Sequence, residues 1–517
     1  MVTDDQLGNI NVYSPAIEMA EAIRKGVISS RELVDLHIRR IEEKNPDINA
    51  IVLKDFEAAR QRADQADEMV RVAGRSDLKL GPFHGVPLTV KESIFTPTFK
   101  TTMGDPNFSV PGGATCRPFD LLTDFEEGGG AILLGKSNLC CQALDWECNN
   151  PIYGETSNPF DFLRSPGGSS GGGAAALAAG FTPLEFGTDL GGSIRIPSAM
   201  NGVVGHCATR WVVPNPNPIY SWPCIGGLAS RALGQHLDKL LWMARAGPMA
   251  RTVEDVIAML ELLGGEAAAK LPRPKNSFTL KGARIAIWKS DPMCPPGKEV
   301  TRALHVAIQA LTKAGATVEE LTPPVDLKET YQIYFRFLGP VTGPHMSEAQ
   351  RANVKNGKAR DSYPPEMRSP YWEMDVSGVD GVPKDNQEAY IKAAKAWDDF
   401  LKGNYDAVLS PVFPTEAWPK ASHPTSALPN SETGARKFKV DDDENRCYGD
   451  AIFWAHLSVL LGLPATSFPV CRTTKGLPVG LQAFGAKGTD FIVLRVVQLL
   501  VQELKTDEFE PPADFVV

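Results

Sequence analysis

The 517-residue sequence predicts an α/β fold, and three observations lead to this expectation. Segments with helical patterning alternate with short apolar runs of strand length along much of the chain. The composition, with 43% hydrophobic and 22% charged residues, is typical of a globular protein. No apolar run approaches the length of about 18 residues that marks a membrane span, so we expect no transmembrane helix.

The first two helices are predicted from their capping residues. We place Ser14 at the N-cap of the first helix, with Pro15 at its first helical position. The second helix begins at Ser29 and Glu32, which have capping-box spacing. Because proline removes a backbone donor, we expect this helix to stop before Pro46.

The elements that follow alternate in type. Buried strands are predicted over 86–90, where the strand delivers Lys91 at its end, and within 128–138. The other segments predicted as helices are 57–74, 252–264, 298–314 and 491–504. The other segments predicted as strands are 48–53, 283–288, 317–321, 406–411, 464–470 and 477–485.

Charge and cysteine usage exclude some classes of protein. A formal net charge of −9 without a basic stripe argues against a nucleic-acid partner. The polar N-terminal stretch lacks the pattern of a secretory signal, so we expect a cytoplasmic protein. The nine cysteines are odd in number and form no CxxC pair, so we expect free thiols rather than a disulfide framework or a zinc site.

The segment SPGGSSGGGAAALAAG, residues 165–180, is costly to order, because each glycine loses about 0.5–1 kcal/mol relative to alanine in regular structure. A flexible linker is disfavoured, since strong structural elements flank the segment. A phosphate-binding loop is disfavoured, since no lysine follows the glycines and no strand leads into a Rossmann pattern. The remaining interpretation is a tight active-site turn that presents a serine hydroxyl.

Such a serine needs a base, and the eight histidines show no motif placement. Lys91 is the other candidate, because desolvation at the end of a buried strand lowers the pKa of a lysine. A second serine, Ser193, lies in GTDLGGSIRIPS after two glycines. The backbone N–H groups before Ser193 are expected to point at one spot, as an oxyanion hole requires.

Together these segments resemble the amidase signature family. The resemblance rests on GVPLTVKES, SPGGSSGGGAAALAAG and GTDLGGSIRIPSAMNGVVG in this order, and on the closing segments YDAVLSPVFPT, GLPATSFPV and GLPVGLQAFG. It covers roughly residues 10–505. It implies a single α/β/α domain over 1–517, with a large mixed β-sheet sandwiched by helices and a signature core at about 80–215. The segment 322–400 is expected to be an insertion that lines the pocket or forms a lid.

The resemblance implies a hydrolase that needs no metal or cofactor. Ser193 matches the nucleophile, Ser169 matches a bridging serine that follows a cis peptide bond, and Lys91 matches the base. The implied oxyanion hole is formed by the N–H groups of Leu190, Gly191, Gly192 and Ser193. The implied supporting residues are Ser170, Asp189 and Arg195.

The expected substrate is a small-molecule amide or carbamate, since family members accept fatty acid amides, aryl acylamides, peptide amides and some carbamates. Trp146, Trp211, Trp222 and the aromatic-rich segment 330–375 favour an apolar or aryl substrate. The segment 140–150 is expected to line the site, with its cysteines as small buried apolar residues. We expect a monomer or homodimer.

Two segments depart from the family pattern and bear on the substrate rather than on the reaction. ESIFTPTFKTTMGDP follows Lys91 in place of a short glycine turn, and HCATRWVVPNPNP follows NGVVG without a lysine-proline pair. Two alternatives stay open. One is the glutamine-hydrolysing subunit of a tRNA-dependent amidotransferase, and the other is a non-catalytic binding protein of the same fold.

Overall fold

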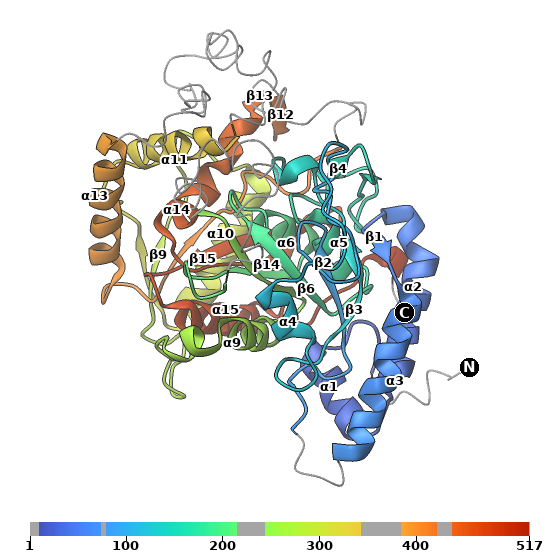
Figure 1. Cartoon of the computed structure of the whole chain (residues 1–517). Helices are drawn as coiled ribbons and strands as arrows, with labels where there is room; N and C mark the ends of the chain where they lie inside the picture. The colour runs from blue at the N-terminus through green and yellow to red at the C-terminus, as the bar shows by residue number, and fades with distance from the viewer. Residues whose placement is uncertain (1–9, 74–78, 215–242, 343–383, 421–436, 516–517) are drawn as a thin grey trace.

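The structure is a computed structural model that describes residues 10–73, 79–214, 243–342, 384–420 and 437–515. Its centre is an 11-stranded sheet in the order β1-β3-β2-β6-β8-β7-β14-β15-β11-β9-β10 (Figure 1). The strands are β1 (Ile51–Lys54), β2 (Pro87–Lys91), β3 (Ile132–Ser137), β6 (Leu184–Asp189), β7 (Val204–Cys207), β8 (Arg245–Ala250), β9 (Arg284–Ile287), β10 (Thr317–Glu320), β11 (Ala407–Ser410), β14 (Ala465–Arg472) and β15 (Pro478–Phe484). Two short hairpins lie outside it: β4 (Asn149–Asn150) with β5 (Gly154–Glu155), and β12 (Lys437–Val440) with β13 (Asp443–Cys447).

The sheet is mixed, as predicted. The triplets β3-β2-β6 and β10-β9-β11 are parallel, whereas the central strands from β8 to β15 pair antiparallel. Strand β2 pairs with β6 in the register Thr89↔Glu185. Because these neighbours are parallel, their carboxyl ends meet at one edge of the sheet. Lys91 and Asp189, the last residues of β2 and β6, therefore lie at the same edge.

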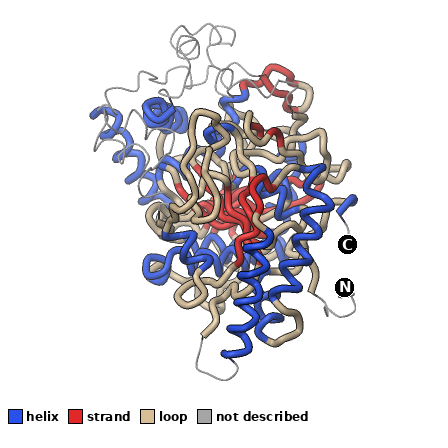
Figure 2. The backbone as a smooth tube through the Cα atoms, turned by 45° about the vertical axis from the view of Figure 1, so that its right-hand side comes forward, coloured by secondary structure: helices blue, strands red, loops and turns tan. Residues whose placement is uncertain are grey.

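Helices cover both faces of the sheet, which confirms the predicted sandwich. One apolar cluster joins α1, α9, α10 and α15 to the strands, and a second joins α11, α13 and α14. Figure 1 shows α9 and α15 below the strands and α11 and α14 above them, and Figure 2 shows the strands enclosed by helices. The helices are α1 (Ala16–Arg24), α2 (Ser30–Ile48), α3 (Phe56–Ala73), α4 (Arg117–Thr123), α5 (Gly171–Ala178), α6 (Arg195–Asn201), α9 (Val253–Ala269), α10 (Lys298–Lys313), α11 (Leu327–Thr342), α13 (Lys384–Leu401), α14 (Phe453–Leu461) and α15 (Asp490–Leu504).

Most of the predicted elements are confirmed with small shifts of their ends. The helices predicted over 57–74, 298–314 and 491–504 correspond to α3, α10 and α15. Helix α9 runs five residues beyond the predicted end at 264, across a non-helical Gly265 with φ 46°. The capping box of Ser29 and Glu32 is present at the start of α2.

The predicted start of α1 is wrong by one residue. Pro15, not Ser14, occupies the N-cap position, and it offers no side-chain acceptor. Instead, the N–H groups of Ala16 and Ile17 donate to the two carboxylate oxygens of Asp255 on α9, at 2.9 and 3.0 Å. An anion at a helix N-terminus is favourable, so a residue distant in sequence caps this helix.

The predicted end of α2 is also wrong, because the helix passes through Pro46 and ends at Ile48. Pro46 lies in the last turn, where it removes a single backbone donor. The side-chain oxygen of Asn45 accepts the N–H groups of Ala50 and Ile51 at 2.8 and 2.9 Å and thereby fixes the exit from the helix.

The cysteines that the structure describes are free thiols, as the sequence predicted. Cys116, Cys140, Cys141, Cys148, Cys207, Cys294 and Cys471 are free. Cys224 and Trp222 lie outside the described residues, as does the segment 343–383 between α11 and α13. The single-domain organisation and the lid role of 322–400 stay predictions. Within the described ranges, no helix has both the length and the apolar character needed to cross a membrane.

Candidate active site

Lys91 ends strand β2 and is fully buried. Its Nζ lies 2.6 Å from Ser169 Oγ and 3.0 Å from Thr188 Oγ1. Burial lowers the pKa of Lys91 to about 8, because a charged ammonium is poorly solvated inside the protein. The negative charges of Asp189 and Glu185 act in the opposite direction. The result is a lysine that reaches its neutral form near physiological pH.

The segment 165–180 is an ordered turn that leads into helix α5 and is buried throughout. The peptide bond between Gly168 and Ser169 is cis, as the resemblance implied. Gly167 has φ +77°, and a Cβ there would lie 2.9 Å from Pro197 Cα. A Cβ on Gly168 would lie 2.9 Å from the carbonyl oxygen of Asp145. These two glycines are therefore required by close backbone approach, and the segment is not a linker.

Ser193 lies in the turn between β6 and α6, and 7% of its surface is exposed. Its carbonyl oxygen accepts the N–H of Ser170 at 3.1 Å. The Ser170 hydroxyl donates to the carbonyl oxygen of Thr188 at 3.3 Å. Ser170 thus links the turn that carries Ser169 to the turn that carries Ser193, and the three residues predicted as catalytic lie on segments that contact one another.

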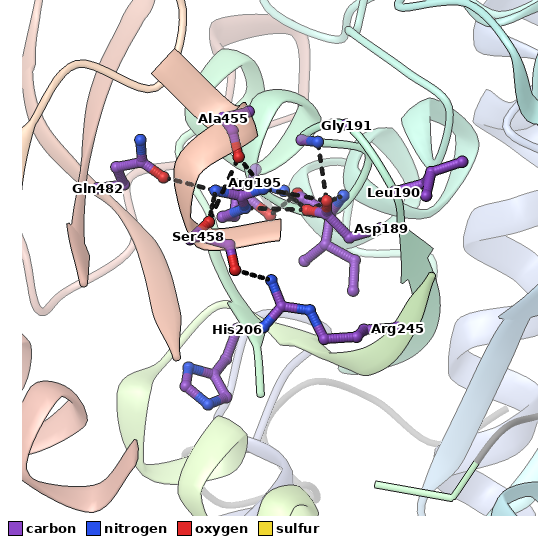
Figure 3. Close-up of polar contacts among 12 residues, drawn as sticks. Asp189, Leu190, Gly191, Arg195, His206, Arg245, Ala455, Ser458 and Gln482 are labelled. Atoms are coloured by element: carbon purple, nitrogen blue, oxygen red, sulfur yellow. Dashed lines mark hydrogen bonds and ion pairs between the residues drawn. The ribbon is translucent and has the colours of Figure 1, made fainter. Parts of the chain in front are cut away.

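Asp189 and Arg195 form a buried bidentate ion pair across the Ser193 turn (Figure 3). Asp189 Oδ2 lies 3.0 Å from Arg195 Nε, and Asp189 Oδ1 lies 3.1 Å from Arg195 Nη2. Burial by itself raises the pKa of Asp189, but Arg195 outweighs it and the pKa falls to about 2. The carboxylate also accepts the N–H groups of Gly192 and Ile194, at 2.8 and 3.1 Å. The ion pair therefore fixes the backbone on both sides of Ser193.

Arg195 also connects this turn to the C-terminal part of the chain. Its Nη1 donates to Ser458 Oγ on α14 at 2.6 Å and to Gln482 Oε1 on β15 at 2.8 Å, and its Nη2 donates to the Ala455 carbonyl at 3.2 Å (Figure 3). A buried guanidinium with this many acceptors is well satisfied. The supporting position predicted for Arg195 is thus at the centre of a hydrogen-bond network.

The oxyanion donors differ from the sequence expectation in one respect. The Gly192 N–H donates to Asp189 Oδ1, so the expectation of a free donor at this position is wrong. Within the described residues, the N–H groups of Leu190, Gly191 and Ser193 donate no hydrogen bond. Asp189 accepts the Gly192 N–H because Arg195 holds the Asp189 carboxylate facing the turn.

The segment 140–150 packs against the catalytic turns. The Trp146 indole Nε1 donates to the Gly191 carbonyl at 3.0 Å, and its ring packs on Tyr448 with centroids 5.1 Å apart. The thiols of Cys140 and Cys148 are buried, and burial raises the pKa of Cys148 to about 11. They are therefore protonated, as expected for small apolar residues. Trp211 differs from Trp146, because 67% of its surface is exposed.

Sequence reasoning missed three residues that contact the site or act on its charges. Thr188 Oγ1 accepts a hydrogen bond from Lys91 Nζ. Thr188 directly precedes Asp189 in the motif, so the sequence could have indicated it. Glu185 is buried in β6, where it accepts the hydroxyls of Thr89 and Ser137 at 2.6 and 2.7 Å, and its charge raises the pKa of Lys91. Tyr334 donates to the Leu190 carbonyl from a distant helix, and only the aromatic richness of its segment pointed towards the site.

Comparison with known sequences identifies the family of this chain. The family described as Amidase matches residues 32–494. Fatty-acid amide hydrolase 2-B of Danio rerio is 35% identical over 332 residues, which are 62% of this chain and 59% of that protein. The match thus spans less than two thirds of that relative. A glutamyl-tRNA(Gln) amidotransferase subunit of Symbiobacterium thermophilum is 30% identical over 94% of this chain and 96% of its own length.

Solved structures show the same fold. A 6-aminohexanoate cyclic dimer hydrolase complexed with substrate superposes with a TM-score of 0.73 at 21% identity, covering 98% of this chain and 100% of its own. A bacterial aryl acylamidase of the amidase signature enzymes has a TM-score of 0.70 at 23% identity, covering 96% of this chain and 99% of its own. The family match extends over most of the sequence. The chain therefore belongs to the amidase signature family of hydrolases.

Proposed function

We propose that this protein hydrolyses the C–N bond of a small-molecule amide through an acyl-enzyme on Ser193. The observation that carries the proposal is the 2.6 Å contact between Lys91 Nζ and Ser169 Oγ at a fully buried site next to the Ser193 turn. A buried lysine with a pKa of about 8 supplies a neutral amine as base. No other described lysine with a pKa lowered in this way contacts a serine hydroxyl.

In the first half-reaction, neutral Lys91 accepts the proton of the Ser169 hydroxyl while Ser169 accepts the proton of Ser193. Ser193 Oγ forms a bond to the amide carbonyl carbon, and the carbonyl π electrons move to oxygen. The N–H groups of Gly191, Leu190 and Ser193 stabilise this oxyanion. Loss of one such donor lowers the rate by about 10²–10³ in other hydrolases.

The oxyanion then collapses and the C–N bond breaks. The proton held by Lys91 returns through Ser169 to the departing nitrogen, which leaves as an amine. Water next attacks the ester of Ser193 with the same relay as base. A carboxylic acid leaves, and the Ser193 hydroxyl regains its proton, so that the triad returns to its starting state.

The substrate that we propose is an amide or carbamate with an apolar or aryl group. Two relatives, named as a fatty-acid amide hydrolase and an aryl acylamidase, act on substrates of this kind according to their names. Trp146, beside the Ser193 turn, supplies an aromatic surface consistent with this class. We place the enzyme in the cytoplasm as a monomer or homodimer, without a nucleic-acid partner.

One alternative is supported by a specific observation. The identity to the glutamyl-tRNA(Gln) amidotransferase subunit extends over 94% of this chain. Such a protein would hydrolyse glutamine and would copurify with stable partner subunits. Glutamine hydrolysis in the presence of a copurifying partner, with no turnover of anilides or carbamates, would favour this alternative.

The direct test is covalent labelling with a fluorophosphonate probe, which reacts only with an activated serine. We expect the wild-type protein to be labelled and the Ser193→Ala variant to be unlabelled, with turnover abolished. Stability should change by no more than about 1–2 kcal/mol, since a serine at a site contributes little to folding. Equal labelling of both proteins would remove Ser193 as nucleophile, and a wild type that is never labelled would favour the non-catalytic alternative. A panel of anilides, primary amides and carbamates then defines the substrate.

A further inference from the structure

We infer that Tyr334 is a positioning residue of the oxyanion hole, because its hydroxyl holds the Leu190 carbonyl and thereby directs the Gly191 N–H towards the substrate. The inference rests on the proposed function and adds to it a residue from helix α11, far from the signature motifs. It also gives the Gly191 and Gly192 N–H groups different roles, although the family resemblance implied both as oxyanion donors.

Tyr334 is fully buried, and its hydroxyl donates to the Leu190 carbonyl oxygen at 3.0 Å. Its ring packs on Phe335 and His456, with centroids 5.5 and 6.0 Å away. The close approach depends on Gly191, since a Cβ there would lie 3.2 Å from the Tyr334 hydroxyl. The phenol is therefore held in place by packing and meets a turn that leaves room for it.

The direction of the Gly191 N–H follows from the geometry of the peptide bond. In a trans peptide, the carbonyl of one residue and the N–H of the next point in opposite directions within one plane. The Leu190–Gly191 peptide is trans, so the bond from Tyr334 to the Leu190 oxygen sets where the Gly191 N–H points. Among the residues that the structure describes, the Gly191 N–H has no acceptor, which leaves it available for an oxyanion.

In the next peptide unit, between Gly191 and Gly192, both the carbonyl and the N–H form hydrogen bonds within the protein. The Gly191 carbonyl accepts from Trp146 Nε1 at 3.0 Å, and the Gly192 N–H donates to Asp189 Oδ1 at 2.8 Å. That plane has no free donor, although it belongs to the same turn. Of the two successive planes, only the one that Tyr334 holds presents an N–H to the site.

Tyr334 keeps its donor role over the working pH range. Burial raises the pKa of its phenol, and the nearby Asp189 carboxylate raises it further, so the hydroxyl stays protonated. A hydrogen bond to a peptide carbonyl also polarises the whole amide and strengthens its N–H as a donor. Tyr334 thus both directs and strengthens the Gly191 donor.

The test compares two conservative variants on one helix. Tyr334→Phe removes the hydroxyl that holds Leu190. Tyr331→Phe is the matched control, because Tyr331 is also fully buried on α11 and its hydroxyl donates to another backbone carbonyl, that of Gly449, at 3.4 Å. Both variants are assayed with the anilide that the wild type cleaves, and rates are normalised to the folded fraction measured by circular dichroism.

We expect Tyr334→Phe to lower kcat about tenfold with KM unchanged within about twofold, since a misaimed donor affects the transition state more than the bound substrate. The rate constant for fluorophosphonate labelling should fall by a similar factor, while Tyr331→Phe stays within about twofold of wild type. Equal losses in both variants, or a rise in KM with kcat unchanged, would overturn the inference. A wild type that is neither active nor labelled would instead contradict the proposed function.

Discussion

Two buried lysines lie on neighbouring strands of the sheet, and their difference shows what makes a lysine a base. Lys91 ends β2, and Lys136 lies in β3 next to it. Both are fully buried, and burial lowers the pKa of each to about 8. By burial and pKa alone the two residues are equivalent.

Their partners separate them. Lys136 Nζ donates to the Lys100 carbonyl at 2.9 Å and to Thr101 Oγ1 at 2.7 Å, in the segment that follows β2. Lys91 contacts Ser169, and the next residue, Ser170, donates its N–H to the Ser193 carbonyl. In the register of β2 and β3, Lys136 is opposite Val90 rather than Lys91, so the two ammonium groups project to opposite faces of the sheet.

A lowered pKa identifies a lysine as a candidate base, and its hydrogen-bond partner decides its role. The acceptors of Lys136, on Lys100 and Thr101, belong to a loop and are not among the residues predicted as catalytic. Glu92, whose carboxylate accepts the N–H groups of Thr102 and Met103 at 2.6 and 2.8 Å, raises the pKa of Lys136 against the effect of burial. We interpret Lys136 as an anchor for this loop.

The largest expected effect comes from replacing each lysine by methionine. Lys91→Met should lower kcat/KM by about 10³-fold, because the general base is lost, and should leave the fold intact. Lys136→Met should instead lower the free energy of unfolding by about 3 kcal/mol, because two charge-assisted hydrogen bonds are lost, with kcat of the folded enzyme within a few-fold of wild type. Steady-state kinetics and urea unfolding measure both, and a reversed pattern would break the distinction.

The second effect is the pH dependence of the rate. Lys91 acts in its neutral form, so kcat/KM should fall about tenfold per pH unit below the pKa of about 8 and level off above it. The Lys136→Met variant should keep the same profile, since its ammonium is not linked to the reaction. A flat wild-type profile to acidic pH would remove Lys91 as the base. A profile shifted in Lys136→Met would show that the two lysines are coupled.

The smallest effect concerns the hydroxyls next to each ammonium. Thr188→Val removes an acceptor that stabilises charged Lys91, so the pKa seen in the pH–rate profile should move to lower pH by about half a unit. Thr101→Val, the matched change beside Lys136, should cost about 1 kcal/mol of stability and leave the profile in place. Movement of the profile to higher pH in Thr188→Val would contradict the role given to this contact.

The sequence predicted the parts of the site that lie within continuous motifs. Lys91 and Ser193 have local signals, a strand end and a glycine turn, whereas the role of Ser169 was implied by the resemblance to the amidase signature family. The structure brings the three segments together. The capping of α1 was missed because its acceptor, Asp255, lies on another helix. A partner of this kind is chosen by tertiary packing, which leaves no trace in the local pattern.

The same limit applies to Tyr334 and Gly192. The hydrogen bond of Tyr334 to Leu190 joins residues 144 positions apart, and nothing near either residue indicates the other. The engagement of the Gly192 N–H depends on the orientation of Asp189, which is set by Arg195. Which donors of a glycine turn are free is thus a property of the folded network.

Arg195 has a consequence for how the protein is made. Its acceptors Ser458 and Gln482 lie 263 and 287 positions further along the chain. During synthesis the nucleophile turn leaves the ribosome long before the residues that brace it. A growing polypeptide that has passed Ser193 but not Gln482 therefore lacks part of this hydrogen-bond network, and catalytic competence should arise only after Gln482 has left the ribosome.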